Sequence, residues 1–550
     1  NSGSQRVNIR IRRIVTYYLD TLLFQKEIIC INIGQAGVQM SNACWELFCI
    51  EHGLDTGGFP RTKHELKDVD STSDIAAFFH ETNIGRYVPR AINVDLEPTV
   101  IEQVEFEKNI YKETIADEIR SGVYRTLWHP NCLITSNEDA SNNFARGRYT
   151  VGKTIAKRLF TQLIKMVRDC HQLHGFILMN SLGGGTGSGL TSLILDKISI
   201  EFAKHPKVSS VIYPAPQLAT SIVEPYNAVL GTSATIDQSD LVFLCDNEAM
   251  YEICHDKLKL SLPQYTHLNR VVSQLFSSLT VSIRFGSSLD HDLSHLQTNL
   301  VPYPRIHFPF ANYAPLFHQD FNDHDTLTTS QITRELFEET NQLVKCDVTV
   351  GKYMACCVQY RGLVVPRTVN VALLEIKKRQ DIKFVEWCPT GFKVGISPMP
   401  SVFILNSQQT PIIRNVAMFS NSTSIEQAWA KLMNKYNQLY RKQAFVHWYV
   451  GEGMEEAEFK ASQEDIQRIQ KDYKDLDEEA LLFDLSYEKN ESKPECVEKT
   501  NSLPESDLEK SNVVTETEVR KSVTVYKEER MTSFIKSSGF PSLYENEYIP

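Results

Sequence analysis

Gly183-Gly184-Gly185-Thr186-Gly187-Ser188-Gly189 is the stretch that decides the fold. The apolar run Phe176–Met179 before it predicts a buried strand, and the amphipathic pattern Leu190–Phe202 after it predicts a helix. Glycines between a strand and a helix let the backbone approach an anion, and the helix dipole favours negative charge there. No lysine follows, so backbone N–H groups, two hydroxyls and a metal ion would hold the anion. The stretch therefore predicts a phosphate-binding loop.

Strands alternate with helices along most of the chain. Ile28–Ile33 is an apolar run that leads into the helical pattern Val38–Glu51, and three more short runs predict strands at Ala91–Val94, Val211–Tyr213 and Leu241–Leu244. This alternation is typical of an α/β fold with a parallel sheet, whose ligands bind outside the carboxyl ends of the strands. Glycines, acids and amides follow four of these strands: Gly34-Gln35-Ala36-Gly37, Asp95-Leu96-Glu97, Gly183–Gly189 and Asp246-Asn247-Glu248.

A second glycine motif competes for the same role. Gly147-Arg148-Tyr149-Thr150-Val151-Gly152-Lys153-Thr154 fits the P-loop pattern, which would make Lys153 a phosphate ligand of an ATPase. That pattern needs a buried strand directly before it, whereas Ser141–Arg146 is polar. We therefore interpret the match as the start of a helix with Lys153 in solvent.

Composition excludes several classes of protein. The 550 residues have a formal net charge of −11, which argues against a nucleic-acid coat protein. No apolar run is long enough for a transmembrane helix. The 12 cysteines contain no CxxC pair, which favours free thiols in a reducing compartment. Residues 474–550 hold 18 acidic and 10 basic residues with scattered apolar ones, so we expect a disordered tail there.

The motifs together resemble the tubulin family, within the tubulin/FtsZ GTPase fold. The resemblance runs from about Ile28 to Tyr473 and rests on the glycine stretch, Gly34–Gly37, Asp95–Pro98 and Val301-Pro302-Tyr303-Pro304-Arg305. Among tubulins it resembles the α subunit at Glu138–Asn143, Lys352–Cys357 and Ala444–Glu456, and Pro398–Asn415 has the length of a loop that is longer in α than in β subunits.

The resemblance implies a site for GTP and Mg²⁺. Glu97 would place Mg²⁺ through water, with Asp95 and Asp139 as further acids near the metal. Thr220 and Glu224 would contact ribose, Asn247 and Asn269 would bind the guanine edge, and Tyr265 would stack on it. The phosphates would be held by Gln35, Gly183, Gly184, Gly185, Thr186 and Gly187, with Ala140, Ser141 and Asn142 closing from another loop. Asp139 and Ser181 complete the predicted nucleotide-binding set.

One departure from the family concerns catalysis. In the family's α subunit a Glu follows Asp-Leu-Thr and activates water against the GTP of the next β subunit, whereas here the segment reads Asp292-Leu293-Ser294-His295. A histidine near a triphosphate is drawn toward its protonated form, which cannot act as a base. We therefore expect weak or absent GTP hydrolysis at interfaces that this chain completes.

Other departures concern loops and termini. Residues 101–114 are an extra polar stretch that partly echoes the segment after it, and Lys63 and Lys67 do not align with the family's acetylated lysine. The tail has no polyglutamate run and ends in Tyr548-Ile549-Pro550, so we expect no detyrosination cycle.

The domain prediction follows the family. Residues 1–27 are an N-terminal extension of doubtful status, 28–246 a GTP-binding domain, 247–422 an α+β intermediate domain, 423–473 a C-terminal helical pair, and 474–550 the acidic tail. The resemblance implies a cytoplasmic, cytoskeletal protein that pairs with β-tubulin in microtubules, with associated proteins and motors as further partners and with no nucleic acid or membrane partner. The alternative is a GTP-binding tubulin-like regulator that does not polymerise.

Overall fold

A six-stranded sheet forms the first layer of the fold in the computed structural model. The structure describes residues 26–61, 74–97, 123–215, 217, 219–285, 292–318, 327–388, 390–404 and 412–490. All five strand pairs in the order β5-β4-β1-β6-β7-β8 are parallel. The strands are β1 (Glu27–Ile33), β4 (Ala91–Asp95), β5 (Leu133–Thr135), β6 (Leu173–Ser181), β7 (Lys207–Tyr213) and β8 (Leu241–Asp246). The predicted α/β fold class is confirmed.

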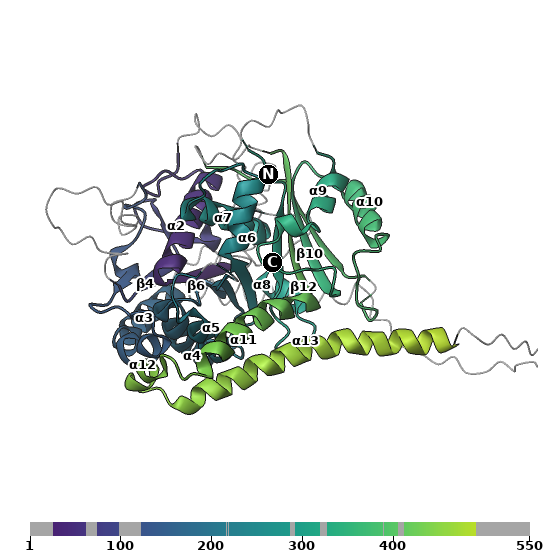
Figure 1. The fold of residues 1–550 in the computed structure, drawn as a ribbon. Coiled ribbons are helices and arrows are strands. Elements are labelled where there is room, and N and C mark those ends of the chain that lie inside the picture. The colour runs from purple at the N-terminus through teal and green to yellow at the C-terminus, as the bar shows by residue number, and fades with distance from the viewer. Residues whose placement is uncertain are drawn as a thin grey trace, which may run out of the picture. The chain divides into compact units, whose positions relative to one another are not determined.

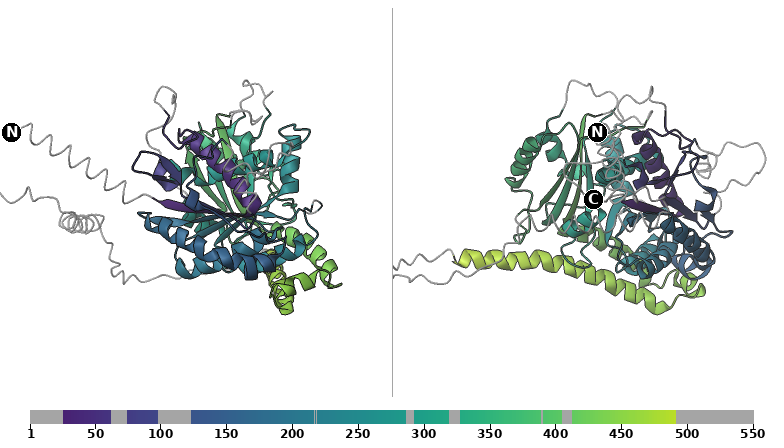
Figure 2. Two further views of the ribbon diagram at one scale, coloured as in Figure 1. Left: turned by 90° about the vertical axis from the view of Figure 1, so that its left-hand side faces the viewer. Right: turned by 180° about the vertical axis from the view of Figure 1, so that it is seen from behind.

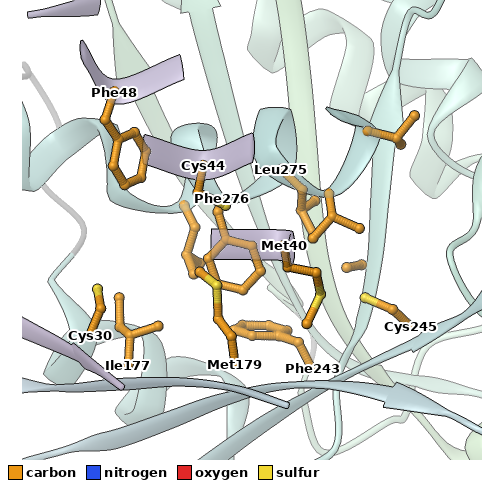
Figure 3. Packing of buried hydrophobic residues seen from close by; sticks show 14 of the residues in the cluster. Cys30, Met40, Cys44, Phe48, Ile177, Met179, Phe243, Cys245, Leu275 and Phe276 are labelled. Atoms are coloured by element: carbon orange, nitrogen blue, oxygen red, sulfur yellow. The ribbon is translucent and has the colours of Figure 1, made fainter. Parts of the chain in front are cut away.

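Helices cover both faces of this sheet (Figure 1). On one face, α2 (Gly34–Glu51) and α7 (Tyr265–Arg284) pack on the sheet through Met40, Cys44 and Phe276, as Figure 3 shows. On the other face, α3 (Val151–Arg168) and α4 (Thr191–Glu201) enclose a separate apolar cluster with β1, β4 and β6. The strands are buried on both faces, which explains why they are continuous apolar runs.

A second sheet of four strands follows in the chain, in the order β11-β10-β12-β9. Only β10 and β11 pair in parallel, and the other pairs are antiparallel. Two helices, α9 and α10, pack on it and lie at the right in Figure 1. The bounds are β9 (Phe310–Ala314), β10 (Tyr353–Gly362), β11 (Phe392–Ser397), β12 (Arg414–Ser422), α8 (Leu293–Leu300), α9 (Thr329–Glu335) and α10 (Pro366–Lys377).

The remaining helices bind the two sheets together. A third cluster joins α5 to the C-terminal helices through aromatic side chains in edge-to-face contact, including Tyr226, Tyr436 and Phe459. Figure 2 shows from a second side that α13 is a long helix that runs along the molecule. These helices are α5 (Glu224–Thr235), α6 (Asn247–Asp256), α11 (Glu426–Tyr440), α12 (Val446–Gly451) and α13 (Glu456–Asn490), and a hairpin pairs β2 (Phe79–Glu81) with β3 (Tyr87–Pro89).

A buried ion network ties the first layer to the second sheet. Glu51, the last residue of α2, accepts hydrogen bonds from Arg284 (2.5 Å) and Arg361 (2.8 Å), and Ser277 Oγ bridges the two guanidinium groups. All three charged side chains are buried. The two guanidinium groups and a Ser277 hydrogen bond lower the pKa of Glu51 to about 2 against the effect of burial. The network therefore carries a net positive charge in the interior.

The structure corrects one predicted boundary. Disorder was expected from residue 474, but α13 continues to Asn490 and the compact unit ends at Tyr487. The segment Lys474–Asn490 holds four Leu and three Glu, which favour helix even where the composition is acidic. The extension before Lys26, the insertion 101–114, Lys63, Lys67, the tail after Asn490 and residues 405–411 of the long loop lie outside the described residues. Among the described residues, no helix is both long and apolar enough to cross a membrane.

Candidate functional site

A cavity of about 580 Å³ lies at the carboxyl ends of the strands of the six-stranded sheet. All seventeen predicted nucleotide-binding residues line it, although they come from segments far apart in the chain. They are Gln35, Glu97, Asp139, Ala140, Ser141, Asn142, Ser181, Gly183, Gly184, Gly185, Thr186, Gly187, Thr220, Glu224, Asn247, Tyr265 and Asn269. The structure thus brings the predicted set together at the edge where parallel sheets bind ligands.

The glycine stretch passes directly from strand to helix. β6 ends at Ser181, and the helical turn Thr186–Leu190 begins within the stretch and continues into α4. The first N–H groups of a helix have no partner within it, so they are free to bind an anion. A Cβ on Gly187 would lie only 2.1 Å from the Ser181 carbonyl oxygen. Only glycine fits at this position. Because the helical turn begins at Thr186, fewer residues of the stretch form a loop than the sequence suggested.

A second loop, Asp139–Asn142, forms the facing wall. The Asp139 carboxylate accepts hydrogen bonds from the backbone N–H (3.0 Å) and hydroxyl (2.8 Å) of Ser141. Ser141 and Asn142 both have positive φ, at 46° and 53°. This left-handed turn is uncommon outside glycine, and Asn is among the residues that tolerate it best. The turn holds Asp139, Ser141 and Asn142 on the wall that faces the glycine stretch.

Asn227, a residue that the sequence analysis missed, connects these two loops. Its amide nitrogen donates to the carbonyl oxygens of Asn142 (2.7 Å) and Gly183 (2.9 Å). Its amide oxygen accepts from the Phe144 N–H (3.0 Å) and the Tyr449 hydroxyl (2.8 Å). The side chain is fully buried, and the bonds to Gly183, Phe144 and Tyr449 lie in the interior, whereas the bond to Asn142 is partly buried. A buried amide inside a helix, where Asn is unfavourable, was the signal that could have revealed it.

Carboxylates gather at the phosphate end of the cavity. Asp95 ends β4, Glu97 follows two residues later, and Asp139 faces them. Burial, together with the nearby charges of Glu97 and Asp139, raises the pKa of Asp95 to about 7, although backbone N–H groups act in the opposite direction. Asp95 Oδ2 is buried and has no hydrogen-bond partner in the described part of the chain. A hard divalent cation such as Mg²⁺ prefers oxygen ligands and would offset these charges, so the donor set fits that ion.

The other end of the cavity carries hydroxyl, amide and aromatic groups. Glu224 Oε1 accepts hydrogen bonds from the backbone N–H and hydroxyl of Thr220. Asn247 is the first residue of α6, and Tyr265 and Asn269 lie one turn apart at the start of α7. The Tyr265 ring is 44% exposed and packs against Tyr251 at 6.2 Å between centroids. This end offers donors and acceptors beside a flat aromatic face, which suits a purine base.

Among the lining residues that were not predicted, two polar ones lie on the helices α2 and α6. Gln39 lies one turn after Gln35 on α2, and Tyr251 lies one turn after Asn247 on α6. Both follow from helical periodicity once the first residue of each pair is placed, because side chains four apart share a helix face.

The interpretation of the competing P-loop match is confirmed. Gly147 lies in a helical turn that leads into α3, and Lys153 is exposed and does not line the cavity. A Cβ on Gly147 would lie 2.2 Å from the Gly185 carbonyl oxygen. The glycine is therefore needed because this turn packs directly beneath the phosphate loop.

His295 lies away from the cavity. It is exposed on α8, and it does not line the cavity of its own chain. Its carbonyl oxygen accepts hydrogen bonds from the side chains of Thr298 and Asn299. The imidazole is thus presented to solvent, where it could meet a neighbouring subunit.

Two comparisons with known families agree with this geometry. Residues 27–255 match the Tubulin/FtsZ family, GTPase domain, and residues 304–434 match the Tubulin C-terminal domain. The first match spans the six-stranded sheet from β1 to β8, and the second spans the four-stranded sheet from β9 to β12.

Proposed function

The chain belongs to the tubulin family, and we propose that it binds GTP with Mg²⁺, pairs as an α-type subunit with a β-type subunit, and enters microtubules. The observation that carries the proposal is the single cavity lined by all seventeen residues that the sequence analysis selected. These residues come from α2, β6, α5, α6, α7 and the segments between them, and the edge of a parallel sheet where ligands bind brings them together.

Backbone groups carry most of the phosphate binding in this proposal. The glycine stretch supplies N–H donors at the start of the α4 segment, and the dipole of that helix favours the anion. Mg²⁺ would supply the positive charge that a P-loop takes from lysine, with Glu97 and Asp139 as candidate ligands and Asp95 close to them. Asn247 and Asn269 would select guanine, because an amide offers both a donor and an acceptor.

The assignment to the α type rests on the sequence segments Glu138–Asn143, Lys352–Cys357 and Ala444–Glu456, which resemble the α subunit. The first of these forms the loop that faces the glycine stretch, and its residues Asp139–Asn142 line the cavity. Pairing with a β-type subunit and entry into microtubules follow from that assignment.

His295 makes hydrolysis weak in this proposal. The exposed position on α8 is where the family's α subunit presents a carboxylate to the GTP of the next subunit. An imidazole facing a triphosphate favours its protonated form and loses its capacity as a base. In copolymers with a β-type subunit, we expect phosphate release well below that of an ordinary α-type subunit, and His295→Glu should raise it. Equal release from both polymers would refute the role of His295.

Nucleotide bound after co-purification with a β-type subunit tests the central claim. We expect GTP, recovered unhydrolysed from a sample that forms polymer. Gly185→Ala should abolish retention, because its Cβ would lie 2.5 Å from the Asn143 backbone nitrogen. Lys153→Ala should retain GTP fully, and loss of nucleotide in this control would instead favour the P-loop reading.

A GTP-binding regulator that does not polymerise is the second candidate. The observation in its favour is His295, since a subunit without the interface carboxylate has lost one reason to enter a lattice. Co-sedimentation with β-type polymer separates the two functions. A chain that binds GTP and stays in the supernatant while lowering polymer mass would be a regulator.

A further inference from the structure

One helix of this acidic protein has an exposed face whose charged side chains are all basic. Within Val151–Arg168, all of which the structure describes, there are five basic residues and no acidic one. All five are exposed: Lys153, Lys157, Arg158, Lys165 and Arg168. We call this set the α3 basic stripe.

Helix geometry places these residues on one continuous surface. At about 100° per residue they fall within an arc of about 140°, and they span about 22 Å along the axis. The opposite side of the helix carries Ile155, Leu159 and Leu163, which are buried in the cluster beneath the sheet. The helix is therefore held by its apolar side, and the stripe makes no contribution to the core.

The stripe is uncompensated within the described part of the chain. None of its five side chains lies within ion-pair distance of a carboxylate there. Among the described residues, the charged groups of the stripe make one such contact, Lys153 Nζ over the Tyr149 ring at 5.5 Å. By contrast, Arg148 on the preceding turn forms an ion pair with Asp196 at 2.6 Å. Like charges at i and i+4, such as Lys153 and Lys157, destabilise a helix slightly. The stripe therefore lowers the stability of α3, and folding gives no reason for it.

We propose that the α3 basic stripe binds an acidic polypeptide segment, rich in Glu or Asp, from a partner protein. Charge complementarity identifies the partner's sign, and the length of the stripe sets its size at about seven extended residues. The chain as a whole carries −11, so a long polyanion lying across it would meet repulsion, whereas a short segment meets only the stripe.

The side chains on the stripe disfavour other polyanions. Membrane binding by an amphipathic helix uses exposed apolar side chains, and single-stranded nucleic acid stacks on aromatic ones. No large apolar side chain between Val151 and Arg168 is exposed. A purely ionic surface of this kind suits a flexible acidic peptide.

Fluorescence anisotropy with a labelled oligoglutamate peptide of about 12 residues tests the proposal, with the full chain at about 50 and about 200 mM NaCl. We expect saturable binding that weakens with salt. The triple variant Lys157→Glu, Arg158→Glu, Lys165→Glu should bind about tenfold more weakly. The matched control Lys378→Glu, Arg441→Glu, Lys442→Glu changes the net charge equally on exposed cations elsewhere, and it should stay within about twofold of the unmodified chain.

Equal loss in the two triple variants would overturn the proposal, because it would show attraction to net charge alone. Tighter binding of a single-stranded RNA oligomer, or of phosphatidylserine vesicles, would also overturn it. Carbodiimide crosslinking of the peptide to the unmodified chain gives a second measurement that does not depend on folded variants. We expect crosslinks at Lys153, Lys157 and Lys165, and crosslinks confined to other lysines would contradict the assignment.

Discussion

Replacing Asn227 by Ala tests whether one buried amide organises the nucleotide site. The change removes four hydrogen bonds, to Asn142, Gly183, Phe144 and Tyr449, at 2.7–3.0 Å. Each is worth about 1 kcal/mol net, and groups left buried without a partner cost more. Water can enter the space left by the side chain and bind some of these groups, so we expect the substitution to cost about 2–4 kcal/mol of free energy in total.

This loss should appear mainly in nucleotide binding. Asn227 joins the two loops that face each other across the cavity, so without it GTP would have to order them itself. A loss of 2–4 kcal/mol corresponds to an affinity about 30-fold to about 1,000-fold lower. Tyr449→Phe is the matched control. It removes only the hydroxyl donor and leaves both loop contacts intact, so it should cost about 1 kcal/mol or less.

GTP dissociation constants from the purified protein, measured beside urea unfolding, separate the two effects. If Asn227→Ala binds GTP within about threefold of the unmodified chain, the amide does not organise the site. If both variants lose the same affinity, the Tyr449 contact and not the loop contacts would be responsible.

Three further changes have defined outcomes. The pKa of Asp95 is raised to about 7, so the native state keeps a proton that the unfolded chain releases above about pH 4. In urea titrations, the free energy of unfolding of the unmodified chain should therefore fall as pH rises from about 4 to about 7. Asp95→Asn should flatten this pH dependence. Added Mg²⁺ should weaken that fall if the ion binds there, and no change with Mg²⁺ would contradict the site. Glu51→Gln should lower the free energy of unfolding by about 3–5 kcal/mol, because it leaves Arg284 and Arg361 buried without a counter-charge, and an effect below about 1 kcal/mol would refute that reasoning. Gly187→Ala should prevent GTP retention, since its Cβ would lie 2.1 Å from a backbone oxygen, and normal retention would show that the loop can move aside.

Much of the nucleotide domain could be predicted because its signals are local. The buried strands of a parallel sheet are apolar runs, and Phe176–Met179 and Leu241–Leu244 both lie within strands of the structure. The residues that follow such strands share one edge of the sheet. Gln35 and Asn247 could therefore be assigned to one cavity before any distance was known.

The rest depended on contacts between distant segments. Asn227 acts through loops more than 40 residues away, and no local pattern indicates which carbonyl oxygens it meets. The Glu51 network likewise joins residues more than 200 positions apart. The end of the C-terminal helix was misplaced because an acidic composition was taken as disorder, although Glu and Lys are also good helix formers.

The two ends of the helix α2 lie in different parts of the molecule. Gln35, in its first turn, lines the cavity, and Glu51, its last residue, is fixed by Arg284 of α7 and Arg361 of β10. The helix between them is about 25 Å long and packed along its length, so it behaves as a stiff rod. A displacement of the cavity end would therefore move the Glu51 end and the contact that it makes with the second sheet. Under the proposed function, a change at the nucleotide would therefore reach the second sheet through this one helix.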